Sequence, residues 1–173
     1  MVRGIIFRSL PDETTICDVG IDLAHQLGHQ TLFAWQGIDP ILESPLNSPV
    51  FSQLRQANRP AIQTCHASFA LAYILFFTSR YADDPECARV AKKRDSWDIN
   101  TLEESLDLSL VLLGRSCEFT ELDEALMQEM VATVESDMKA VFAETGMKQR
   151  RFVEFNYGAC TWKTPRRCVA RLA

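Results

Sequence analysis

Histidine and cysteine offer the most chemistry in this chain, and the spacing of the histidines is the first pattern to weigh. The chain has three histidines, and His25 and His29 are four residues apart. On a helix they share one face and could supply two nitrogen ligands to a metal ion. No glutamate lies beside His25, and the sequence indicates no third ligand. We therefore interpret the pair as a polar helix face, and we predict no metal site and no cofactor.

The cysteines do not form a recognisable redox or catalytic motif. Cys65 and His66 are neighbours, so on a helix their side chains are about 100° apart and do not face each other as a nucleophile and its base must. The chain contains no Cys-x-x-Cys, and we expect most of its cysteines to be core thiols in a reducing compartment. They are Cys17, Cys65, Cys87, Cys117, Cys160 and Cys168.

Other catalytic patterns are weak or missing from the sequence. Asp18 with Asp22, and Glu103 with Asp107, can share helix faces, but such pairs are typical of solvated acidic surfaces. There is no glycine-rich phosphate loop and no serine nucleophile elbow. We predict no catalytic residue and favour a protein that is not an enzyme, while a metal- or cysteine-dependent enzyme using His25, His29 or Cys65 stays as an alternative.

Charge divides the chain into two unequal parts. The net charge is -5 overall, but residues 1–147 carry 11 basic and 22 acidic side chains, whereas residues 148–173 carry 7 basic side chains and one glutamate. In the basic part, cations alternate with aromatic rings, a combination that could contact phosphates and stack on bases. The alternative is that these residues dock on the acidic body. The predicted nucleic-acid or partner contacts are Arg150, Arg151, Tyr157, Trp162, Lys163, Arg166 and Arg167.

The same C-terminal segment resembles a known family. Residues 142–171 contain, in order, Glu-Thr-Gly, Phe-Val-Glu-Phe-Asn-Tyr, Thr-Trp and Arg-Arg. This order is similar to a segment of the DDE transposases carried by bacterial insertion sequences, in which a helix is followed by two strands. The resemblance implies an RNase H-like origin for this segment and an association with DNA. It covers about 30 residues, and the residues that carry it are Glu144, Gly146, Phe155, Tyr157, Trp162, Arg166 and Arg167.

The rest of the chain departs from that family. The catalytic core of those transposases needs two aspartates and a glutamate to hold two divalent metal ions. We assign none of the acidic residues of this chain to such a triad. The resemblance therefore implies a truncated or domesticated fragment without catalytic activity.

Hydrophobic periodicity predicts a mainly helical body. Residues 67–77 are apolar except for Ser68, so a helix over residues 60–80 must lie inside other elements, while this apolar middle is too short to cross a bilayer. A helix from Ser9 to residue 35 has Ile16, Val19, Leu23, Leu27 and Ala34 on its apolar face. Further helices are expected over residues 49–57, 85–94, 100–114 and 120–145. Alternating patterns predict strands at residues 2–7, 152–157 and 168–172.

The sequence thus predicts one domain of 173 residues in the mainly α (α+β) class. A helical bundle surrounds a buried central helix, with either a small antiparallel hairpin formed by the C-terminus or a three-stranded sheet that the N-terminus joins. We expect a non-catalytic interaction protein or small subunit of a larger assembly, with DNA, RNA, an acidic protein or a second copy as partner and no membrane. The first residues lack the apolar core of a signal peptide, so we expect the protein to be located in the cytoplasm.

Overall fold

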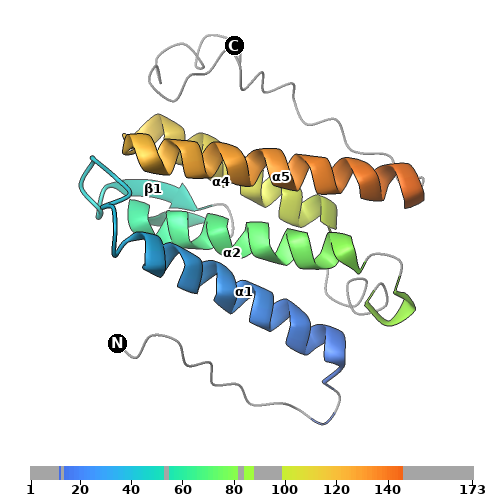
Figure 1. Cartoon of the computed structure of the whole chain (residues 1–173). Coiled ribbons are helices and arrows are strands. Elements are labelled where there is room, and N and C mark those ends of the chain that lie inside the picture. The colour runs from blue at the N-terminus through green and yellow to red at the C-terminus, as the bar shows by residue number, and fades with distance from the viewer. Residues whose placement is uncertain (1–11, 13, 53–54, 82–83, 88–98, 146–173) are drawn as a thin grey trace.

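The computed structural model describes residues 12, 14–52, 55–81, 84–87 and 99–145 (Figure 1). These residues form a mainly helical bundle with a small antiparallel sheet, which confirms the predicted fold class. The sheet consists of β1 (Pro49–Ser52) and β2 (Ala57–Pro60). The long helices are α1 (Ile16–Trp35), α2 (Ala61–Arg80), α4 (Ile99–Ser116) and α5 (Glu121–Thr145).

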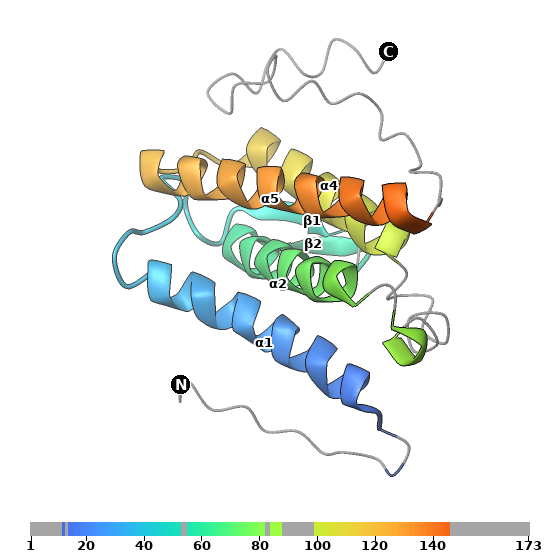
Figure 2. The same ribbon diagram turned by 45° about the vertical axis from the view of Figure 1, so that its right-hand side comes forward.

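Helix α2 is the centre of the bundle, as its apolar composition predicted. It lies antiparallel to α1, while α4 and α5 lie on its other side (Figure 2). Twelve of its twenty residues are buried, including Phe69, Leu71 and Leu75. Within the helix the buried Ser68 Oγ donates to the carbonyl of Thr64 at 3.1 Å, while the buried Thr64 Oγ1 has no hydrogen-bond partner among the described residues.

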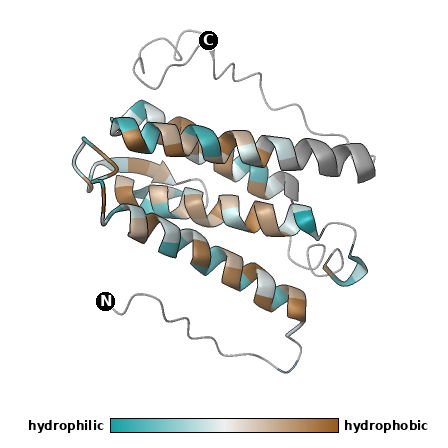
Figure 3. Cartoon of the chain, viewed as in Figure 1, coloured by the Kyte–Doolittle hydropathy of each residue, from teal (hydrophilic) through white to brown (hydrophobic). Residues whose placement is uncertain are grey.

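The full length of α2 corrects one expectation. The apolar middle alone is short, but the whole helix is long and apolar enough to cross a membrane by length and composition. In the described structure it instead packs against α1, α4 and α5, as the core helix of a soluble protein does. Figure 3 shows α2 as apolar over most of its length.

The start and the buried face of α1 differ from the prediction. The helix begins at Ile16, because Thr15 caps it and forms a capping box with Asp18. Its buried residues are Cys17, Asp18, Ile21, Ala24, Gly28 and Leu32. On the face predicted to be inward, Ile16 is 76% exposed, Leu23 48% and Leu27 54%. The reason is that α1 packs close to the backbone of α2, and the small residues on the buried face of α1 allow this contact.

The sheet lies where a short helix was predicted, and that prediction was wrong. Ser48-Pro49 suggested a helix start, yet Pro49 opens β1 and pairs with Pro60 at the outer end of the hairpin. Proline is tolerated at a strand end, and alternation buries Val50 and Ser52 while Phe51 points outward. Gln56, with φ of 50°, makes the turn into β2. The strands predicted at the two chain ends lie outside the described residues.

Helices α4 and α5 follow their predicted patterns with one shift. Leu102, Leu106, Leu110 and Leu113 are all buried, as predicted for α4. In α5, Met130 and Val134 are buried as predicted, but Leu122 is 42% exposed. The next residue, Asp123, is instead buried, at 2% exposed.

Candidate metal centre

The three histidines of the chain come together between α1 and α2. His25 and His29 lie one turn apart on α1, and their Nε2 atoms are 3.0 Å apart. One of these nitrogens donates a proton to the other, with the direction set by the tautomers. The ring centroids of the pair are 4.8 Å apart.

His66 completes the group from the second turn of α2. The antiparallel arrangement brings the beginning of α2 beside the end of α1, so His66 faces the last turns of α1. Its ring centroid is 5.5 Å from that of His29 and 4.4 Å from that of Phe33. Nδ1 of His66 is buried and has no hydrogen-bond partner in the described part of the chain. His66 was not grouped with His25 and His29 from the sequence, because residue spacing does not show which helices pack against each other.

Burial keeps these imidazoles neutral at physiological pH. It lowers the pKa of His25 and of His66. For His29, burial and the neighbouring His25 and His66 together lower the pKa to about 4. A metal ion binds the neutral imidazole, so the environment that disfavours protons leaves the nitrogen lone pairs free for coordination.

The spacing of the first two nitrogens fits a shared metal ion. Two imidazole nitrogens bound to one ion are about 2.9 to 3.4 Å apart, depending on the angle at the metal. The 3.0 Å between His25 Nε2 and His29 Nε2 falls in this range. A metal ion could therefore replace the proton that the two nitrogens share.

The third histidine is placed more loosely. Among the described residues, ligand atoms of three or more side chains all lie within 4.8 Å of one another at Cys17, Asp84 and Cys87, and not at the histidines. His25 and His29 thus form a chelating pair, and His66 lies beside them with its ring centroid 5.5 Å from that of His29.

A second polar group lies in the core around Asp123. Burial, and secondarily the charge of Asp39, raise the pKa of Asp123 to about 7. Its Oδ2 is buried and has no hydrogen-bond partner among the described residues. Asp39 Oδ1 accepts hydrogen bonds from the backbone of Ile41 at 2.9 Å and from Thr120 Oγ1 at 2.5 Å. These bonds hold the buried Ile41 in a left-handed conformation with φ of 69°.

The thiol of Cys65 belongs to this buried group. Cys65 is 0% exposed, and burial, Asp123 and Cys117 together raise the pKa of its thiol far above the ordinary range. Such a thiol stays protonated and is a poor nucleophile. The geometry therefore gives no support to a cysteine nucleophile at Cys65 with His66 as its base.

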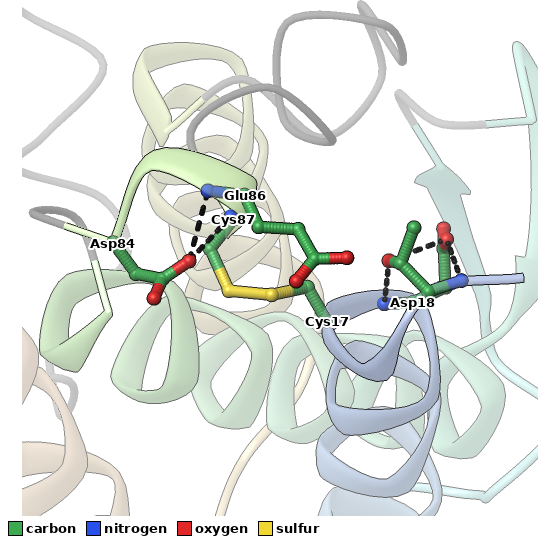
Figure 4. Close-up of a disulfide and its surroundings, with 6 residues drawn as sticks. Cys17, Asp18, Asp84, Glu86 and Cys87 are labelled. Carbon is green, nitrogen blue, oxygen red and sulfur yellow. Dashed lines mark hydrogen bonds between the residues drawn. A yellow bond between two sulfur atoms is a disulfide. The ribbon is translucent and has the colours of Figure 1, made fainter.

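The cysteines correct a second expectation. Cys65 and Cys117 are buried free thiols, as predicted, but Cys17 and Cys87 form a disulfide that links α1 to the segment after α2 (Figure 4). These two cysteines are 70 residues apart, and they were expected to be core thiols because the sequence gives no sign of a contact between such distant segments. Cys160 and Cys168 lie outside the described residues.

The predicted nucleic-acid or partner contacts, from Arg150 to Arg167, also lie outside the residues that the structure describes. No family model matches the chain, and no curated protein matches it. The resemblance of residues 142–171 to insertion-sequence transposases therefore stays a prediction.

Proposed function

We propose that this protein is a non-catalytic helical protein that binds a divalent transition-metal ion through His25, His29 and His66. The observation that carries the proposal is the 3.0 Å separation of His25 Nε2 and His29 Nε2, with His66 facing His29 from α2. Imidazole ligands suit Zn²⁺, Cu²⁺ and Ni²⁺, and affinities of such sites rise toward Cu²⁺. Three protein ligands leave a position for water or an exchangeable ligand.

The site joins two helices, so a bound ion also stabilises the fold. An ion that binds the native state alone adds about 2.7 kcal/mol of stability at a free concentration of one hundred times its Kd. The protein would respond to metal by a tighter contact between α1 and α2.

Equilibrium dialysis and calorimetry on the untagged, oxidised chain test the proposal with Zn²⁺, Cu²⁺ and Ni²⁺ in turn. We expect one ion per chain and a loss in affinity of about tenfold or more for His25→Gln or His29→Gln. His66→Gln should lose less, because the ligand atoms of the three histidines do not all lie within 4.8 Å of one another, whereas His25 Nε2 and His29 Nε2 are 3.0 Å apart. Gln30→Ala is the matched control, since it alters α1 next to His29 without removing a ligand. Equal affinities for wild type and His29→Gln, or no uptake of any of the three ions, would overturn the proposal.

The charge division of the chain favours a second function, in which residues 148–173 contact nucleic acid. Seven basic side chains and one glutamate in 26 residues support it, beside a body of net charge -11. In this proposal the helical body is an interaction protein or small subunit, in the cytoplasm, and the basic segment is its contact surface. An acidic protein partner is the other outcome of the test.

Binding to a short DNA duplex and to single-stranded RNA should weaken as salt is raised. Replacing Arg150, Arg151, Arg166 and Arg167 together by alanine should abolish it. A matched control replaces the other basic run, Lys92, Lys93 and Arg94, and should bind as wild type does. Affinity that does not change between low and physiological salt would exclude the nucleic-acid proposal.

A further inference from the structure

A second group of metal-ligand atoms consists of the two disulfide sulfurs and a neighbouring carboxylate, near the beginning of α1 and away from the histidines. The sulfurs of Cys17 and Cys87 and a carboxylate oxygen of Asp84 all lie within 4.8 Å of one another. Figure 4 shows Asp84 beside Cys87, on the segment that the disulfide joins to α1. Two sulfur ligands and one oxygen ligand are a donor set that Zn²⁺ accepts.

Local structure fixes the carboxylate next to the sulfurs. Asp84 Oδ1 accepts hydrogen bonds from the backbone N–H groups of Glu86 and Cys87, both at 2.9 Å. Asp84 therefore caps the helical turn that contains Cys87, and the spacing of three residues places the two side chains on one side of that turn. A disulfide needs no carboxylate beside it, whereas a zinc site with two thiolates gains a third ligand from it.

Cys17 has the right position to act as a thiolate once the disulfide is reduced. It lies in the first turn of α1, where the helix dipole favours negative charge. Metal binding also requires the thiolate form, so the two effects act in the same direction.

We propose that Cys17, Asp84 and Cys87 form a redox-gated site for Zn²⁺ that is closed in the oxidised protein and open in the reduced one. Reduction by a dithiol transfers two electrons and two protons to the disulfide, which gives two protein thiols and one oxidised dithiol. Binding of Zn²⁺ to the two sulfurs releases both thiol protons. Hydrogen peroxide reverses the process, since it takes two electrons from the two thiolates, gives two hydroxide ions and restores the disulfide, and Zn²⁺ leaves.

This site is independent of the histidine centre. Cys17 and His25 are eight residues apart on the same helix, which is a rise of about 12 Å. The two sites also differ in ligand chemistry, because only the disulfide site contains sulfur. A thiolate bound to Co²⁺, used as a probe for Zn²⁺, gives an intense near-ultraviolet charge-transfer band that imidazole does not give.

The experiment uses the full untagged chain with His25→Gln, His29→Gln and His66→Gln, so that the histidine centre is removed. After reduction and removal of the dithiol under argon, we expect one Co²⁺ per chain with the charge-transfer band, and displacement of Co²⁺ by Zn²⁺. The oxidised protein should show no band, and hydrogen peroxide should release the bound metal. Asp84→Asn should weaken binding about tenfold, while Glu86→Gln in the same turn should not change it.

Further variants separate this site from the other cysteines. Cys160→Ser with Cys168→Ser should keep the band, and Cys17→Ser with Cys87→Ser should lose it, with circular dichroism used to check that the helices remain. If the cysteine variant does not fold, Asp84→Asn and the oxidised protein still decide the result. A band that is unchanged in Asp84→Asn and is retained in the oxidised protein, or no Co²⁺ uptake by the reduced protein, would overturn the proposal. Neither result bears on the histidine centre, which is tested in the oxidised wild type.

Discussion

Gly28 of α1 lies directly against the backbone of Phe69 in α2. A Cβ atom added at Gly28 would be 2.6 Å from the carbonyl oxygen of Phe69 and 2.8 Å from the Cα of Ala70. These are backbone atoms, so no side-chain rotation can make room. The missing side chain at this one position therefore sets the distance between the two helices, and with it the distance between His29 and His66.

Gly28→Ala should destabilise the protein and weaken metal binding together. The added methyl group forces α1 away from α2, an overpacking effect that costs about 1 to 3 kcal/mol. Because His29 follows Gly28 directly, the same movement takes it away from His66. Urea unfolding and zinc calorimetry on one preparation measure both effects.

Gly20→Ala is the matched control for this prediction. A Cβ at Gly20 would be 2.2 Å from Cζ of Phe77, which is the far end of a side chain and can move. We expect a smaller loss of stability and no change in zinc affinity. Equal losses for the two variants would contradict the role given to the Gly28 contact.

The buried face of α1 gives a second prediction. Leu32 is 0% exposed and Leu27 is 54% exposed, although both are leucines on the same helix. Leu32→Ala should lower the free energy of unfolding by about 3 kcal/mol, because it leaves a cavity in the core. Leu27→Ala should change it by less than about 0.5 kcal/mol. A large loss for Leu27→Ala would support the face predicted from the sequence instead of the observed one.

The helices could be predicted from the sequence because their signals are local. The apolar run of α2 and the leucines of α4 follow from residue periodicity alone. The face of α1 could not be predicted in this way, because apolar residues lie on both sides of the helix and periodicity alone does not say which side faces α2. The close contact of Gly28 with the backbone of Phe69 decides between the two sides, and it is a tertiary contact.

The proposed metal centre was not predicted, because His25 and His29 were interpreted as a polar helix face without a third ligand. The spacing of four residues placed His25 and His29 on one face, but the third histidine is 37 residues after His29 and belongs to another helix. The pairing of Cys17 with Cys87 is likewise a contact between distant segments. Only the antiparallel packing of α1 and α2, which the sequence did not indicate, shows that His29 lies near His66.

Asp123 provides the pH dependence that can be tested. Its pKa is raised to about 7, above the value of about 4 for an unfolded chain. The folded state therefore holds the proton more tightly, so the stabilising effect is complete below about pH 4 and is lost as pH rises through 7. Between these values the wild type should lose about 2 kcal/mol relative to Asp123→Asn, which carries no charge there.

Urea unfolding of wild type and Asp123→Asn from pH 4 to pH 8 measures this difference, and other titrating groups cancel between the two proteins. Asp39→Asn is a second variant to compare. It removes the neighbouring negative charge, so the pKa of Asp123 should fall, and the loss of stability should be smaller and complete at a lower pH. Parallel stability curves for wild type and Asp123→Asn would show that Asp123 does not titrate in this range.

The disulfide should contribute about 4 kcal/mol, because it closes a long loop. Cys17 and Cys87 are 70 residues apart, and crosslinks of this span strongly restrict the unfolded chain. The double variant Cys17→Ser with Cys87→Ser should unfold at lower urea than oxidised wild type, and dithiothreitol should affect wild type alone. Equal urea midpoints for the wild type with and without dithiothreitol would show that the disulfide does not stabilise the protein. If the reduced pair also binds Zn²⁺, excess zinc in the histidine-free background should restore part of the lost stability, and it should not do so in the double variant.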